Sequence, residues 1–140
     1  MAQVVETIDR RIDRTGLSAL VAAGDVVLIG LFVAVGEFTH GSPPWMAPVG
    51  AIQAFVPFVL GWVLAALGGG LYTTDAWQSP LRALSWTVPA WIVAVLLTMA
   101  IRVLPFVPGG VAVTFVAVSI GVGLALLAPW RMTVAWLSSE

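Results

Sequence analysis

Four long apolar segments dominate the sequence, and each is close to the about 20 residues that a helix needs to cross the hydrocarbon core of a bilayer. We expect these segments at residues 17–38, 50–71, 83–104 and 109–129. Short stretches rich in proline and glycine separate them and are expected to end the helices. The sequence therefore predicts an all-α, polytopic integral membrane protein, in which residues 17–131 form one bundle of four transmembrane helices. Because the connections are short, sequential helices should be antiparallel neighbours.

The composition supports a membrane protein and excludes several classes of function. Hydrophobic residues make up 60% of the chain, charged residues only 9%, and the mean hydropathy is +1.03. A soluble domain is about one quarter charged, so this chain has too few polar residues to cover a water-exposed surface. Its net charge of −1 leaves no basic patch for nucleic acid.

The residue types that are absent narrow the chemistry further. The chain has no cysteine and a single histidine, and its six basic residues are all arginine. A lone histidine without cysteine is not a metal-binding pattern, and we find no nucleophile–base motif or phosphate-binding loop. We therefore predict neither a metal nor another cofactor, and we do not expect an enzyme.

The two ends of the chain are less apolar than the segments between them. Residues 1–16 place Val4 or Val5, Ile8 and Ile12 at helical spacing among charged residues, which fits a short amphipathic helix in the membrane interface or a frayed polar tail. Residues 132–140 are expected to form a short C-terminal tail.

The arginines predict how the bundle is oriented. Five of them fall on one side of a four-pass topology and only Arg102 falls toward the other; the five are Arg10, Arg11, Arg14, Arg82 and Arg131. Cytoplasmic loops carry an excess of arginine and lysine. We therefore expect both termini on the cytoplasmic side of the cell membrane.

Asp25 is the most informative charged residue, because it lies about 12 Å into the first apolar segment at 1.5 Å per residue. Trp62 and Trp91 lie at a similar depth on the second and third segments. Buried indole N–H groups need acceptors, so these three residues form a candidate site. An unpaired aspartate at this depth would favour its neutral form. Asp25 is thus either a hydrogen-bonding centre that holds the helices together or a residue that exchanges a proton or an ion.

A second candidate cluster lies at the opposite, outer end of the bundle. Glu37 and Arg102 lie about 30 Å and 28 Å along parallel helices, and Gln53 begins the second helix at that level. His40 is three residues beyond Glu37 and should be its neighbour on the helix surface. The four side chains are either a lock between helices or the mouth of a ligand site.

Prolines and small residues indicate how the helices pack. Pro57 and Pro89 each remove one backbone hydrogen bond inside a predicted helix, which leaves a carbonyl to be satisfied by another group. Gly61-x-x-x-Ala65 and Ser119-x-x-x-Gly123 are typical of close helix contacts.

Several stretches resemble a known family: "GDVVLIGLFVAVGEFTHG" (24–41), "FVPFVLGW" (55–62), "GLYTTDAWQSPLRAL" (70–84) and "FVPGGVAVTFVAVSIGVGLALLAPWR" (106–131). They resemble a family of small membrane proteins of haloarchaea and actinobacteria, catalogued as domain of unknown function 3054, over about residues 17–131. The resemblance implies four membrane passes and places Asp25, His40 and Trp62 in the family pattern. It implies no catalytic residues.

Two classes of function remain open at this point. The first is a non-enzymatic membrane component that binds a partner protein, a lipid or an isoprenoid. The second is a small oligomeric transporter or channel, with Asp25 as its proton- or ion-exchanging residue. Four helices enclose little volume alone, so a homo-oligomer or a membrane protein partner is expected in addition to the lipid bilayer.

Overall fold

The computed structural model describes residues 2–10, 12–13, 15–41, 43–107 and 112–138, and the side chains of residues 7–10 are outside this description. Its elements are α1 (Ala2–Arg10), α2 (Gly16–Thr39), α3 (Pro48–Gly69), the 3-10 helix η1 (Thr74–Trp77), α4 (Pro80–Arg102) and α5 (Val113–Ser138). Helices α2, α3, α4 and α5 are each long and apolar enough to cross a membrane. The predicted all-α fold with four transmembrane helices is therefore confirmed.

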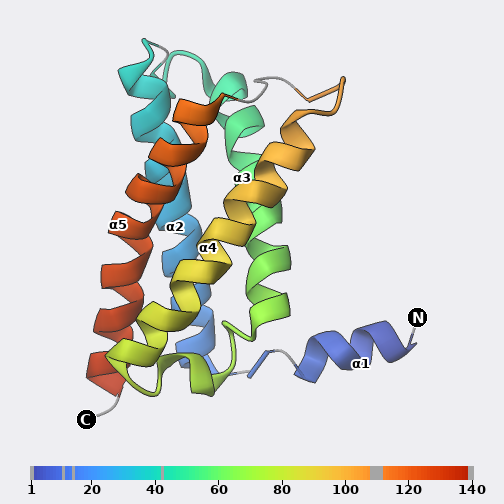
Figure 1. Ribbon diagram of the computed structural model, residues 1–140, viewed down its shortest axis with the longest axis vertical. Helices are drawn as coiled ribbons and strands as arrows, with labels where there is room; N and C mark the ends of the chain where they lie inside the picture. Colours follow the sequence, from blue (N-terminus) through green and yellow to red (C-terminus); the bar gives the residue numbers. More distant parts are fainter. Residues whose placement is uncertain (1, 11, 14, 42, 108–111, 139–140) are drawn as a thin grey trace.

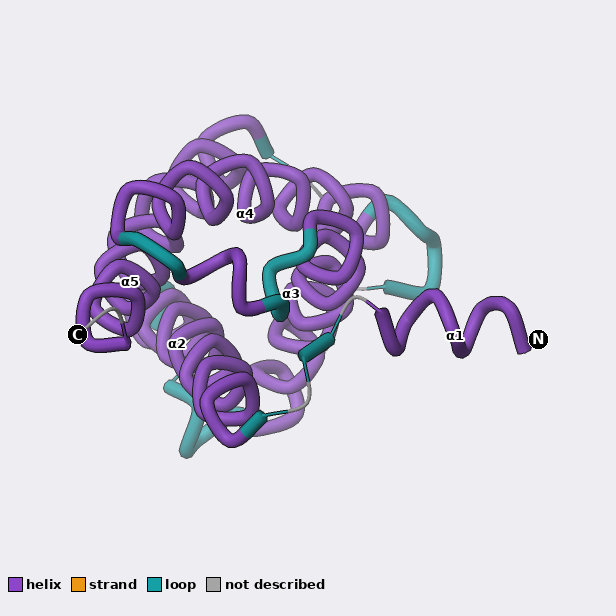
Figure 2. Tube along the Cα trace, turned by 90° about the horizontal axis from the view of Figure 1, so that it is seen from below, coloured by secondary structure: helices purple, strands orange, loops and turns teal. Residues whose placement is uncertain are grey.

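The four long helices form a ring in which sequence neighbours are antiparallel (Figures 1 and 2). Helix α4 packs extensively against α3 and α5, and α2 closes the ring against the same two helices. Many large apolar side chains face outward, among them Val27, Leu31 and Val63. Outward-facing apolar side chains are what lipid contact requires, so the chain is a multi-pass membrane protein.

The two ends of the bundle differ. One end, called the η1 end, carries α1, η1 and the last residues of α5; the other, called the Arg102 end, carries the α2–α3 and α4–α5 connections (Figure 1). Seen from the η1 end, η1 crosses the middle of the ring (Figure 2). Ala76 and Trp77 are buried there against α4 and α5, so η1 closes that end of the bundle.

Helix α1 leaves the bundle sideways at the η1 end (Figures 1 and 2). Val4 and Val5 are more than half exposed. The structure has a helix over Ala2–Arg10, which favours the amphipathic helix over the frayed tail. The helix runs across the bundle axis, which is the direction of a helix that lies in the membrane interface.

The start of α4 and the end of α3 differ from the expected positions because of the residues that cap these helices. Ser79 caps α4 by accepting a hydrogen bond from the backbone N–H of Arg82 at 3.1 Å, and Pro80 occupies the first turn. Serine followed by proline is a good helix start, so α4 begins at Pro80 and not at 83. Helix α3 ends earlier than expected because Gly70 adopts the left-handed conformation with φ 71°.

The expected end of the fourth helix at residue 129 is wrong. Helix α5 continues through Pro129 to Ser138, so most of the expected tail at 132–140 is helical. Val134 and Ala135 are buried, and this packing stabilises the last two turns. The expected start at 109 lies outside the described residues.

Candidate functional site

Asp25 and Arg131 form a buried ion pair between α2 and α5. Asp25 has no exposed surface, and Arg131 is 2% exposed. The guanidinium donates from Nε to Oδ1 at 3.1 Å and from Nη2 to Oδ2 at 2.6 Å. Such a two-pronged contact is the strongest geometry available to an arginine and a carboxylate. The two residues thus join the first and last transmembrane helices.

Tyr72 and Trp62 extend this ion pair into a network. The Tyr72 hydroxyl donates to Oδ2 of Asp25 at 2.8 Å and accepts from Nε1 of Trp62 at 2.9 Å. Burial, together with the nearby charge of Asp25, raises the pKa of Tyr72 well above its usual range. The hydroxyl therefore keeps its proton and remains a donor. The Arg131 guanidinium also lies 5.3 Å and 5.2 Å from the ring centres of Trp62 and Tyr72.

The same network connects the chain segments at the η1 end. Arg131 donates from Nη1 to the backbone carbonyl of Leu71 at 3.0 Å. The backbone N–H of Asp13 donates to the carbonyl of Tyr72 at 2.9 Å, and the N–H of Thr74 donates to the Asp13 carboxylate at 2.6 Å. The segment before α2 and the loop after α3 are thus tied to each other and to α5.

The interpretation of Asp25 as an unpaired aspartate is wrong, because Arg131 pairs with it. Trp62 reaches Asp25 only through Tyr72, and Trp91 does not reach it at all: its indole N–H donates to the backbone carbonyl of Ser119 at 2.9 Å. Arg131 and Tyr72 are the partners that the sequence did not reveal. The sequence did contain one indication that Arg131 is buried, because this arginine lies within a run of apolar residues that continues beyond Pro129.

An aromatic column connects the two ends of the bundle. Trp62 contacts Trp91 with ring centres 6.1 Å apart, Trp91 stacks on Phe58 at 6.0 Å, and Phe58 contacts Phe115 at 6.1 Å. Arg131 lies over the first ring of this column, and Arg102 lies over the last, 4.7 Å from the centre of Phe115. Trp62 and Trp91 have no exposed surface within this column.

A pocket of about 330 Å³ opens at the Arg102 end, and we call it the Arg102 pocket. Its polar lining includes Glu37, His40 and Arg102, three of the four residues expected to gather there. Gln53 is exposed and is not in the lining. Ala54 and Phe58 line the pocket, and Gln53 is turned by about 100° from Ala54 on the same helix.

The walls of the Arg102 pocket are largely aromatic. Phe32, Phe58 and Phe115 contribute rings from α2, α3 and α5. Arg102 interacts electrostatically with Glu37 across the pocket. Ser119 lies one helical turn from Phe115 and is fully buried, and its hydroxyl has no hydrogen-bond partner among the described residues. The pocket therefore combines apolar walls, a charged mouth and one buried hydroxyl.

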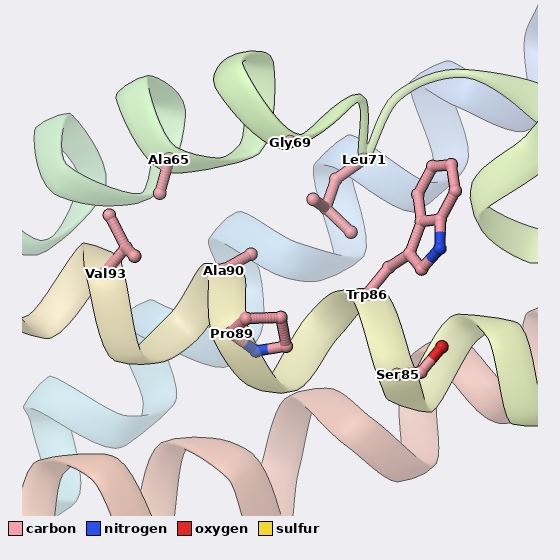
Figure 3. A pocket seen from close by; sticks show the side chains of 8 residues that line it. All are labelled: Ala65, Gly69, Leu71, Ser85, Trp86, Pro89, Ala90 and Val93. Carbon is pink, nitrogen blue, oxygen red and sulfur yellow. The ribbon is translucent and has the colours of Figure 1, made fainter.

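A groove of similar volume, about 330 Å³, lies between α3 and α4 nearer the η1 end (Figure 3). Ala65 and Gly69 leave space on one side, and Pro89, Ala90 and Val93 form the other. No charged residue lines it. This groove is a shallow apolar surface of the kind that a lipid chain covers.

Comparison with known proteins gives one match. Residues 22–134 match the model of a family described as "Protein of unknown function (DUF3054)". The match covers most of the chain, and the chain therefore belongs to this family, as its sequence motifs indicate. No curated protein and no solved structure matches the chain.

Proposed function

We propose that this member of a family without an assigned function is a non-enzymatic membrane component that binds an amphiphilic lipid or isoprenoid. The Arg102 pocket carries this proposal. Ligand sites are concave and mostly apolar, with a few polar groups that fix orientation, and this pocket has that composition. An amphiphile would place its head group near Arg102 and its apolar part against the phenylalanine rings.

The transporter alternative stays a prediction but loses its main support. It required Asp25 to meet water or an ion in a cavity beside Trp62 and Trp91. Asp25 has no exposed surface, and both of its carboxylate oxygens accept hydrogen bonds. These contacts favour a role of Asp25 in helix packing.

Co-purification is the direct test of the proposed function. Protein extracted into lipid nanodiscs is expected to retain about one amphiphile per bundle, identified by native mass spectrometry and organic extraction. The variant Gly36→Phe should lose this amphiphile, because Gly36 lines the pocket and has open space in front of it.

A matched variant separates loss of the pocket from general damage. Gly121 also lies on a transmembrane helix with open space around it, but it is outside the pocket. Gly121→Phe should therefore keep the amphiphile. The proposal is wrong if the unmodified protein carries no amphiphile, or if Gly36→Phe retains as much as Gly121→Phe. A membrane protein found in place of the amphiphile would favour the partner-binding alternative.

The orientation is a further part of the proposal: the η1 end faces the cytoplasm. Arg82 is exposed at this end, whereas Arg131 is buried in its ion pair and no longer counts as a loop charge. Arg11 and Arg14 lie outside the described residues. In the absence of native cysteine, an impermeant maleimide is expected to label Met46→Cys in intact cells and Ala2→Cys only after lysis. The reverse pattern would contradict this orientation.

A further inference from the structure

We infer that the Arg102 pocket selects a neutral amphiphile whose head group is a planar ring bearing hydrogen-bond acceptors, the arrangement found in quinones with an apolar tail. The inference rests on the proposed function and deepens it by naming the head group. Three observations carry it: an unpartnered buried hydroxyl, the charge balance at the mouth, and the aromatic walls.

The Ser119 hydroxyl is the first observation. Ser119 is fully buried and lines the pocket, yet its Oγ has no partner within the described part of the chain. Its backbone carbonyl, by contrast, is already used by the indole N–H of Trp91. Leaving a buried hydroxyl without a partner is unfavourable. A carbonyl oxygen on a bound ligand would accept its proton and remove that cost.

The charge balance at the mouth is the second observation. Arg102 and Glu37 carry opposite charges, both line the pocket, and they interact electrostatically. A guanidinium has five N–H donors, and Arg102 can therefore donate to a ligand while it keeps its interaction with Glu37. Glu37 would repel an anionic head group and so offset part of its attraction to Arg102. This favours a neutral acceptor over a phosphate or a carboxylate.

The phenylalanine side chains that line the Arg102 pocket are the third observation, and they favour a planar head group. Phe32 meets Phe58 edge to face, with ring centres 5.2 Å apart, and Phe58 meets Phe115 at 6.1 Å. Aromatic rings arranged in this way offer both faces and edges to a further ring. A planar ring that packs against these side chains would meet their faces and edges, whereas a branched alkyl chain would gain only apolar contact.

The pocket offers hydrogen-bond donors at two levels. Arg102 lies over the Phe115 ring, and Ser119 follows Phe115 by four residues, which is one turn and about 6 Å along α5. The pocket therefore offers one donor at its mouth and one about a turn deeper, with aromatic side chains between them. An amphiphile with acceptor oxygens at two positions on its ring, as in a quinone, has one acceptor for each donor.

Three probes with the same apolar tail test the head group. Decyl-1,4-naphthoquinone, 2-decylnaphthalene and decyl phosphate are titrated into the protein in phosphatidylcholine nanodiscs, and the dissociation constants are measured calorimetrically. We expect the quinone to bind most tightly. Ser119→Ala should weaken the quinone about three- to tenfold, the value of one hydrogen bond, and leave the naphthalene unchanged.

A matched control separates the loss of a ligand contact from the loss of a buried hydroxyl. Thr87 is also fully buried, and its hydroxyl also lacks a partner among the described residues, but it does not line the pocket. Thr87→Val should therefore leave the binding of all three probes unchanged.

Each contrary result has a distinct meaning. Equal binding of the quinone and the naphthalene, with no effect of Ser119→Ala, would overturn the head-group inference and leave amphiphile binding intact. Tighter binding of decyl phosphate would replace it with an anionic ligand. If no probe binds, or if Gly36→Phe does not reduce binding, the proposed function fails together with the inference.

Discussion

Arg131→Met is expected to lower the free energy of unfolding by about 3–5 kcal/mol, because it leaves the carboxylate of Asp25 buried without its charged partner. Of the hydrogen bonds described above, Asp25 would retain the one from Tyr72 at 2.8 Å. The change would also release the carbonyl of Leu71, which Arg131 now holds at 3.0 Å. Unfolding in mixed micelles, followed by circular dichroism and tryptophan fluorescence, measures the loss.

The double variant Asp25→Leu/Arg131→Met should be more stable than Arg131→Met alone, because neither charge then remains buried by itself. Arg82→Met is the matched control. Arg82 is exposed and donates to Gln78 at 2.7 Å, and such surface contacts contribute about 1 kcal/mol or less. If Arg131→Met costs no more than Arg82→Met, the buried pair does not hold the bundle together.

Membrane insertion and helix number could be predicted from the sequence because they depend on local composition. A run of about 20 apolar residues has few alternatives to a spanning helix, and proline and glycine mark the connections. The helix starts at Thr15 and Ser79 also follow local rules, since each residue caps its helix with its own hydroxyl. The helix ends were predicted less accurately: α5 continues past residue 129 to Ser138, and Gly70 ends α3 before residue 71.

The partner of Asp25 could not be predicted in the same way. Asp25 and Arg131 are separated by 106 residues, and only the packing of α2 against α5 brings them to one level. Arg131 had a simpler explanation as one of the arginines on the cytoplasmic side, and Tyr72 stood out only as part of the stretch 70–84 that resembles the family. The level of a residue along its helix follows from counting residues, but the direction in which each side chain points depends on all four helices together.

At the Arg102 end, too, the sequence predicted the level of the residues but not the direction of every side chain. Equal depth predicted that Glu37, His40 and Arg102 would share one end, and they line one pocket there. Depth gave no information about Gln53, which faces outward. Ser119 was seen only as a small residue in a packing stripe. Only the packing of α5 against α4 shows that the Ser119 hydroxyl has no partner among the described residues, while its carbonyl accepts from Trp91.

Gly61→Ala is expected to lower the free energy of unfolding by about 1–3 kcal/mol through overpacking between α3 and α4. A Cβ at this position would lie 2.5 Å from the backbone oxygen of Ala94 and 2.7 Å from Oγ1 of Thr98. A backbone oxygen inside a helix cannot turn away as a flexible side chain can. The two helices would have to separate, and Thr98 would lose the bond that it donates to the carbonyl of Pro57 at 3.2 Å.

Gly68→Ala on the same helix is the matched control, because nothing lies within 4 Å of the added Cβ. Replacing glycine by alanine in a helix stabilises it by about 0.5–1 kcal/mol, so this variant should be as stable as the unmodified protein or more so. Both variants are compared by thermal unfolding in the same micelles. If Gly61→Ala is no less stable than Gly68→Ala, the close approach of α3 and α4 at Gly61 does not set the packing of the bundle. A loss confined to Gly61→Ala would show that this glycine permits the contact on which α4, the most extensively packed helix of the bundle, depends.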